Sequence, residues 1–160
     1  MDDRVSGQRS SQRSTQIVVA TSAEPSAQVV GNADRRYGFL HRINQLNLPQ
    51  QEEWSVGLAR VSFYSPANAQ VFISCNVVAP SRVGSQVVTE LFHIPLTQTT
   101  AGLFQLEVTN ILFRPVSTST ITFLQIQLTD QQGNPIPPPP VPATDPDTYV
   151  TLFFRRGDVL

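Results

Sequence analysis

The chain lacks lysine altogether and contains one cysteine, Cys75, and two histidines among its 160 residues. A single cysteine excludes an internal disulfide, the usual support of small secreted domains, and suits a reducing compartment. Charged residues make up only 14% of the chain, and 11 arginines against 12 acidic residues leave a net charge of -1. Such a balance produces no positive electrostatic potential that would attract nucleic acid, so we expect nucleic-acid contact to be weak if it occurs.

Long apolar segments are missing as well. No stretch approaches the roughly 18 apolar residues of a membrane-spanning helix. The polar start MDDRVSGQRSSQRST does not resemble a signal peptide, and no Asn-x-Ser/Thr glycosylation site is present. These features predict a protein that is made in the cytosol and has no membrane partner.

The residue clusters that support catalysis are also scarce. His41 and His93 are far apart in sequence and no His-x-His pair occurs, so a metal site of the cupin type is not predicted. Cys75 and His93 could in principle form a thiol nucleophile and its general base. The run VFISCNVV instead favours a buried, inert thiol. No glycine-rich phosphate loop is present. The sequence therefore predicts no catalytic residue, no metal, no cofactor and no enzyme activity.

What the chain does contain is eight short apolar runs separated by gaps that carry Pro, Gly, Asn or Ser. The runs cover residues 14–22, 37–48, 52–63, 70–78, 86–96, 103–116, 120–130 and 148–156. Alternation of apolar and polar residues over such lengths is typical of β-strands, and 160 residues suit one domain. We therefore expect a single all-β domain at 15–156.

Alternation within the runs predicts which side chains face the core. In the last two runs Leu124, Ile126, Leu128, Val150, Leu152 and Phe154 share inward positions, as do Phe104, Leu106 and Val108 in the run before them. The run at 37–48 alternates poorly, which indicates a bulge or a bend. The run at 52–63 is apolar on both parities, with Trp54, Val56 and Leu58 on one and Ala59, Val61 and Phe63 on the other. Both faces of that strand are therefore expected to be covered.

Eight antiparallel strands without a helix fit a jelly roll, an up-and-down barrel or an immunoglobulin-like sandwich. The strand number and the long connections favour a single eight-stranded jelly roll, a β-sandwich whose strands, lettered B to I, form the sheets BIDG and CHEF. In this arrangement the third and eighth runs are neighbours. Both runs have apolar residues on two parities, so we expect the outer BIDG face to pack on another subunit. The candidate interface residues are Val61, Phe63, Tyr149 and Phe153.

Three segments flank or interrupt the expected domain. Residues 1–14 form a polar arm that contains Arg4, Arg9 and Arg13 and is too poor in apolar residues to order itself, so we expect it to be flexible. Residues 131–147 form a proline-rich connection between the last two strands, which we interpret as a stiff surface loop, with a PxxP ligand as the alternative. Residues 157–160 form a short C-terminal tail.

Four blocks in order resemble one protein family. They are EEWSVGLARVSF after an F-x6-L block, VFISCNVVAPSRVGS, ILFRPVSTSTITFLQIQLTDQQGNPI and YVTLFFRR, and together they span about residues 39–156. This order is similar to that of the minor capsid, or penton, proteins of Polinton/Maverick elements and adintovirus-like viruses. The proline-rich insert is longer than the pattern of that family.

The resemblance implies a structural capsid protein of the virion. Family members are single jelly rolls that form homopentamers at icosahedral vertices among double-jelly-roll major capsid proteins. On this basis the expected partners are further copies of the chain and a major capsid protein. The arm that contains Arg4, Arg9 and Arg13 is then a candidate for lining the capsid interior. The alternative is a non-viral jelly-roll module that binds carbohydrate or protein.

A tripeptide at the end of the last strand adds one further candidate partner. Arg156, Gly157 and Asp158 form the sequence that integrins recognise, which resembles a motif displayed by some adenovirus penton bases. Receptor binding requires an exposed, flexible loop. The alternative interpretation is a chance extension of the terminal Phe-Arg-Arg. The cell-surface receptor is therefore a hypothesis that depends on the tripeptide being displayed.

Overall fold

The computed structural model describes residues 15–23, 36–47, 53–117, 120–134, 136 and 147–156, and no helix occurs among them. The strands are β1 (Thr15–Thr21), β2 (Gly38–Asn47), β3 (Trp54–Ser65), β4 (Val71–Cys75), β5 (Ser81–Val83), β6 (Gln86–Val88), β7 (Glu90–Ile94), β8 (Gly102–Glu107), β9 (Phe113–Pro115), β10 (Thr120–Thr129) and β11 (Tyr149–Arg156). The prediction of an all-β chain is confirmed for these residues.

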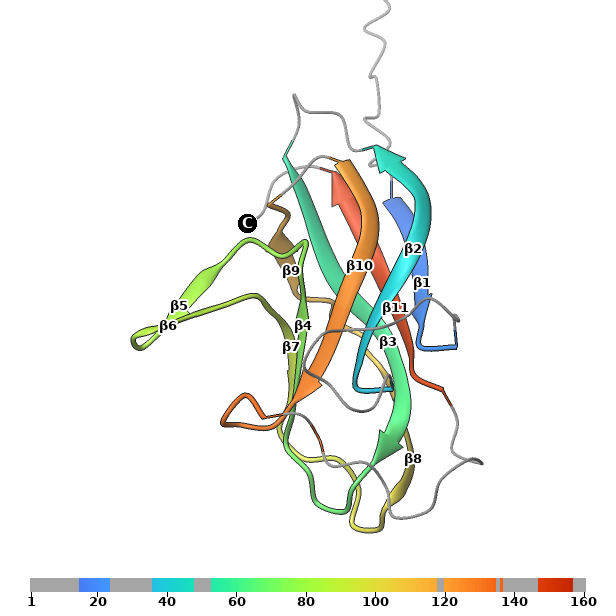
Figure 1. The fold of residues 1–160 in the computed structure, drawn as a ribbon, viewed down its shortest axis with the longest axis vertical. Coiled ribbons are helices and arrows are strands. Elements are labelled where there is room, and N and C mark those ends of the chain that lie inside the picture. Colours follow the sequence, from blue (N-terminus) through green and yellow to red (C-terminus); the bar gives the residue numbers. More distant parts are fainter. Residues whose placement is uncertain are drawn as a thin grey trace, which may run out of the picture.

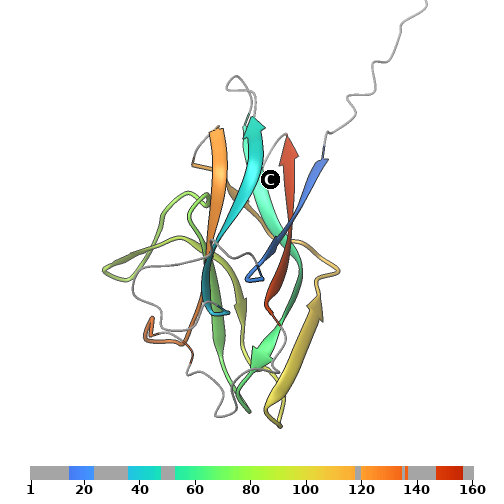
Figure 2. The same ribbon diagram turned by 45° about the vertical axis from the view of Figure 1, so that its right-hand side comes forward.

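Two antiparallel sheets face each other (Figure 1). The first sheet has the strand order β1-β11-β3-β8, with β9 also paired to β3, and the second has the order β2-β10-β4-β7. The third and eighth apolar runs, β3 and β11, are paired as predicted. The view of Figure 2 separates the two layers and shows the β5–β6 hairpin extending from the side of the second sheet. The chain is thus a β-sandwich.

The space between the sheets is filled by the inward residues of both. Leu124, Ile126 and Leu128 of β10 are buried, as predicted, and so are the three inward residues of β11. Phe104 and Leu106 of β8 pack against the same core from a partly buried position. Each fully buried side chain of this size contributes about 1.5–3 kcal/mol to folding, so this core is the main source of stability.

A β-bulge in β3 changes the interpretation of the strongest apolar run. In the pairing of β11 with β3, Thr151 faces Arg60 and Leu152 faces Leu58, so Ala59 is an extra residue on β3. An extra residue reverses the parity of every position that follows it. Val61 therefore lies on the same side as Leu58, and both are buried in the core.

The run at 103–116, expected to be one strand, is two. β8 pairs with Arg60–Ser65 of β3, and β9 pairs with Ser55–Gly57 of the same strand. Between them the chain passes over Gly57, where an added Cβ would clash with Ile111 Cγ2 and approach the Leu112 carbonyl oxygen to 3.0 Å. The absence of a side chain at Gly57 permits this close approach.

Two further differences concern the other runs. The run at 86–96 divides into β6 and β7, and β6 pairs with the short strand β5. The expected bulge in the run at 37–48 is confirmed, because the facing stretches Arg42–Leu46 of β2 and Ile121–Phe123 of β10 differ in length. The number of strands among the described residues thus exceeds the eight expected.

Part of the proline-rich connection is described. Asp130 follows β10 and begins a turn. Its Oδ1 accepts hydrogen bonds from the backbone N–H groups of Gln132 (2.9 Å) and Asn134 (2.8 Å). Gly133 has φ 82, a left-handed conformation that glycine adopts without strain. Ile136 beyond this turn is buried in the core. The polyproline segment itself lies outside the described residues, as do residues 1–14 and 157–160.

Candidate interaction surfaces

The structure separates the four predicted interface residues into two pairs. Tyr149 is 46% exposed and lies with Phe153 on the outer face of the first sheet. Val61 and Phe63 are fully buried in the core, so the prediction that they face outward is wrong. The bulge at Ala59 is the physical reason, because it turns the second half of β3 inward.

An apolar row crosses the outer face of the first sheet. Ile17 of β1 pairs with Phe153 of β11, Phe153 pairs with Gly57 of β3, and Gly57 pairs with Phe113 of β9. Ile17 is 62% exposed. Ile111 fills the place that a side chain at Gly57 would take, so the row is continuous. We call the row and the exposed Val19 and Tyr149 beside it the first-sheet face.

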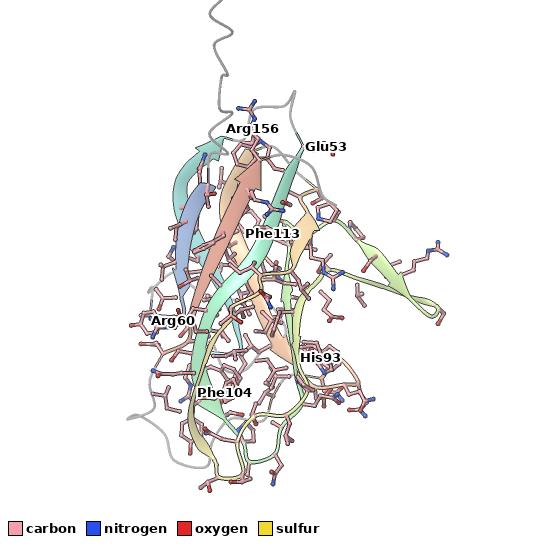
Figure 3. The ribbon with its side chains drawn as sticks, turned by 180° about the vertical axis from the view of Figure 1, so that it is seen from behind. Glu53, Arg60, His93, Phe104, Phe113 and Arg156 are labelled. Atoms are coloured by element: carbon pink, nitrogen blue, oxygen red, sulfur yellow. The ribbon has the colours of Figure 1, made fainter. Side chains whose placement is uncertain are left out.

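Arginines accompany these apolar side chains, and Figure 3 looks onto this side of the molecule. The guanidinium of Arg155 lies 3.9 Å from the centroid of the Phe113 ring, a cation–π contact. Arg60 projects from β3 opposite Glu107 of β8. Among the described residues on or next to the first-sheet face, these two positive charges outnumber the single negative charge of Glu107, so this face has a positive excess.

Sequence reasoning did not identify Ile17, Val19 or Phe113 as surface residues. For the first two a signal was present, because β1 has apolar residues at both parities in the sequence TQIVVAT and carries no charge. A β-strand that is apolar on both sides has one apolar face left over when the other face packs on the core. For Phe113 no signal existed, because its position depends on how β9 pairs with β3.

A groove of about 520 Å³ lies on the opposite side of the sandwich. Its floor is the outer face of the second sheet at Phe72, Ser74 and Gln127, and one wall is the chain from Val87 to Glu90. The other wall is the turn that begins at Asp130. The groove thus combines one aromatic ring, polar side chains and two carboxylates, and no arginine is among the described residues that line it.

The aromatic ring in the groove is supported by a histidine on the neighbouring strand. Phe72 stacks on His93 with ring centroids 4.1 Å apart and ring planes inclined by 7°. The Nε2 amide group of Gln70 lies 3.0 Å from His93 Nε2 and donates a hydrogen bond to it, which requires the histidine tautomer with its proton on Nδ1. His93 therefore has a supporting role beside the groove.

The structure does not bring Cys75 and His93 together as a nucleophile and base. Cys75 faces the core and is 1% exposed, whereas His93 is paired with the outward-facing Phe72. Desolvation by burial raises the pKa of the Cys75 thiol from 9.0 to about 12, and the backbone hydrogen bond from Val77 opposes this only in part. The thiol is thus the inert core residue that its sequence context predicted.

The other sequence candidates fall into three groups. His41 lies on β2, where its Nδ1 accepts a hydrogen bond of 3.3 Å from the backbone N–H of Thr21. Arg156 is the last residue of β11, while Gly157 and Asp158 lie outside the described residues. The same is true of Arg4, Arg9 and Arg13.

The described residues were also compared with the requirements of a metal site and of a membrane-spanning helix. Within the described ranges, no three His, Cys, Asp or Glu side chains are grouped so that they could hold a metal ion. No helix among these residues is long and apolar enough to span a membrane. Comparison of the chain with known protein families and with curated proteins found no match.

Proposed function

We propose that the sandwich is a single eight-stranded jelly roll. The order of the strands within each sheet supports this assignment. In the first sheet, β1, β11, β3 and β8 correspond to jelly-roll strands B, I, D and G. The order β2, β10, β4 and β7 corresponds in the same way to C, H, E and F. On this assignment β5 and β6 are additions to the E–F connection, and β9 continues strand G along the edge of β3.

We further propose that the protein is a structural subunit of a viral capsid, a penton that forms homopentamers at the vertices of an icosahedral shell. The observation that carries this proposal is the first-sheet face, since an antiparallel sheet open to water is normally polar on its outer side. The four sequence blocks that resemble Polinton penton proteins support the same role. In this role the protein is made in the host cytoplasm and ends in the virion, docked among major capsid proteins.

A binding module for carbohydrate is the second candidate, and the groove beside Phe72 favours it. An aromatic ring with amide and carboxylate side chains around it is the kind of surface that takes a sugar ring and its hydroxyl groups. Binding in this groove requires no second copy of the chain, so we expect such a module to be a monomer. The two candidates therefore differ in the mass of the protein in solution.

The deciding experiment is light scattering on the purified chain over a range of concentrations, with negative-stain imaging of the same peak. The penton proposal predicts five times the subunit mass of 17.6 kDa and rings with five-fold symmetry. A monomer at every concentration that also binds a glycan array would overturn the penton proposal in favour of the binding module.

A further inference from the structure

We propose that copies of this chain associate head to tail, with the first-sheet face of one copy receiving the β5–β6 hairpin and adjoining groove of the next. This inference rests on the proposed self-assembly and specifies the two surfaces that meet. Of the interface residues predicted from the sequence, only Tyr149 and Phe153 belong to either surface.

Two of the surfaces that carry exposed apolar side chains lie on opposite layers of the sandwich. One is the first-sheet face, centred on Ile17 and Phe153. The other is the hairpin, where Val87 is 63% exposed and forms part of the groove wall. Because the two surfaces belong to the outer sides of different sheets, they cannot be covered by a single neighbour.

The hairpin itself requires support. β5 and β6 pair only with each other in the described part of the chain and form a separate two-stranded sheet. Figures 1 and 2 show this sheet projecting away from the sandwich. An isolated two-stranded hairpin is at best marginally stable in water, so packing of Val87 on another apolar surface would stabilise it.

The charges of the two surfaces are complementary. Arg60 and Arg155 give the first-sheet face its positive excess over Glu107. Glu90 and Asp130 line the groove. Arg82 of the hairpin, which pairs with Val87, is exposed and offsets one of these two negative charges, so the described residues of this surface keep a negative excess of one. Opposite charges on two facing patches direct association and fix the register, so the partner indicated by this pattern is a second copy of the chain.

Symmetry then distinguishes this arrangement from a two-fold dimer. A two-fold interface would place the first-sheet face against itself, with Arg60 and Arg155 meeting the same positive excess on the other copy. A head-to-tail interface joins two different surfaces, and when its rotation closes it produces a ring. The two complementary surfaces of this chain therefore match the requirements of a closed ring.

The test uses two full-length variants, each of which damages one surface. Ile17→Asp places a charge on the first-sheet face, and Val87→Asp places one on the hairpin, both at exposed positions where folding should be retained. Leu96→Asp, at an exposed residue outside both surfaces, is the matched control. Circular dichroism establishes that each variant is folded before its mass is measured by light scattering.

Each single variant is expected to have the mass of one subunit, and the control the mass of the wild-type assembly. An equimolar mixture of the two variants should form a dimer and nothing larger, because each contributes one intact surface. Glu90→Arg in place of Val87→Asp should give the same dimer.

Assembly of either variant on its own, or a mixture that stays monomeric, would overturn the head-to-tail inference while leaving the proposed capsid role intact. A wild-type chain that is monomeric at every concentration would overturn both.

Discussion

At the scale of single residues, burial decides what Cys75 does. The thiol lies in the core with its pKa raised to about 12 by desolvation, so the native state keeps it protonated where an exposed thiol would ionise. Because the pKa of this thiol is lower in the unfolded chain than in the folded protein, the stability of the protein depends on pH. Cys75 thus contributes to the packing of the core.

This difference in pKa predicts how stability changes in alkaline solution. Between pH 9 and about 12 the unfolded chain binds fewer protons at Cys75 than the native protein, so the free energy of unfolding should fall as pH rises through this window. Below pH 9 the contribution is fully present. Urea unfolding at several pH values should show a smaller alkaline decline for Cys75→Ala than for the wild type. An equal decline in both proteins would contradict the assignment.

Trp54 presents a different case, a buried polar group without a partner. Its indole Nε1–H is buried and, among the described residues, has no hydrogen-bond acceptor. Leaving such a donor unpaired costs about 1–3 kcal/mol, so Trp54→Phe should change the free energy of unfolding little or raise it. Trp54→Ala should lower it by about 3–5 kcal/mol, because the cavity remains. Urea unfolding followed by circular dichroism measures both, and a large loss in Trp54→Phe would indicate a missing acceptor.

At the scale of elements, β3 determines the arrangement of the first sheet. Its bulge at Ala59 allows Val56 and Leu58 before it and Val61 and Phe63 after it to enter one core. The Ala59 carbonyl oxygen accepts a hydrogen bond of 2.9 Å from the Val108 N–H, at the end of β8. The backbone of the bulge is therefore hydrogen-bonded to the chain at the point where β8 ends and the segment that passes over Gly57 begins.

The close approach at Gly57 leads to a prediction for that position. Gly57→Ala should lower the free energy of unfolding by about 1–3 kcal/mol, because its Cβ would displace Ile111 and the Leu112 carbonyl. Gly102→Ala is the matched control in β8, since its Cβ would meet only Gln98 Nε2 at an ordinary 3.5 Å. Chemical unfolding of the two variants measures the difference. If Gly57→Ala is as stable as Gly102→Ala, the segment 109–112 can move away from position 57 without a loss of free energy, and the prediction is wrong.

At the scale of the whole molecule, each sheet of the sandwich has one covered side and one uncovered side. The sides that face each other enclose the core, and the outer side of the first sheet carries aromatic and aliphatic side chains. Apolar side chains in a contiguous row on a surface are typical of protein contact sites. Stability and assembly should therefore respond to different residues of the same sheet.

Two phenylalanines of the first sheet make this separation testable. Phe153→Ser should leave the midpoint of urea unfolding nearly unchanged and reduce the mass measured by light scattering, because Phe153 lies on the outer face. Phe63→Ser should lower the free energy of unfolding by about 3–5 kcal/mol, because Phe63 is fully buried. A fully assembled Phe153→Ser protein would count against the first-sheet face as an interface.

Much of the fold was predictable from alternation alone. In the regular parts of β10 and β11 every second residue is apolar, and its inward position can be assigned without knowledge of the neighbouring strands. Ile126 and Leu152 are buried as expected. The candidate interface was predicted only in part. Tyr149 and Phe153 were identified because they lie in a regular strand, whereas Val61 and Phe63 follow a bulge that the sequence pattern does not reveal.

The sequence by itself determined the all-β character of the chain and the inward residues of the regular strands, because the side chains of a strand alternate through local geometry. Tertiary structure decided the bulge at Ala59, the passage of residues 109–112 over Gly57 and hence the composition of the first-sheet face. These features depend on which strands pair and in which register. Register is a property of two segments far apart in the chain, so one segment cannot specify it alone.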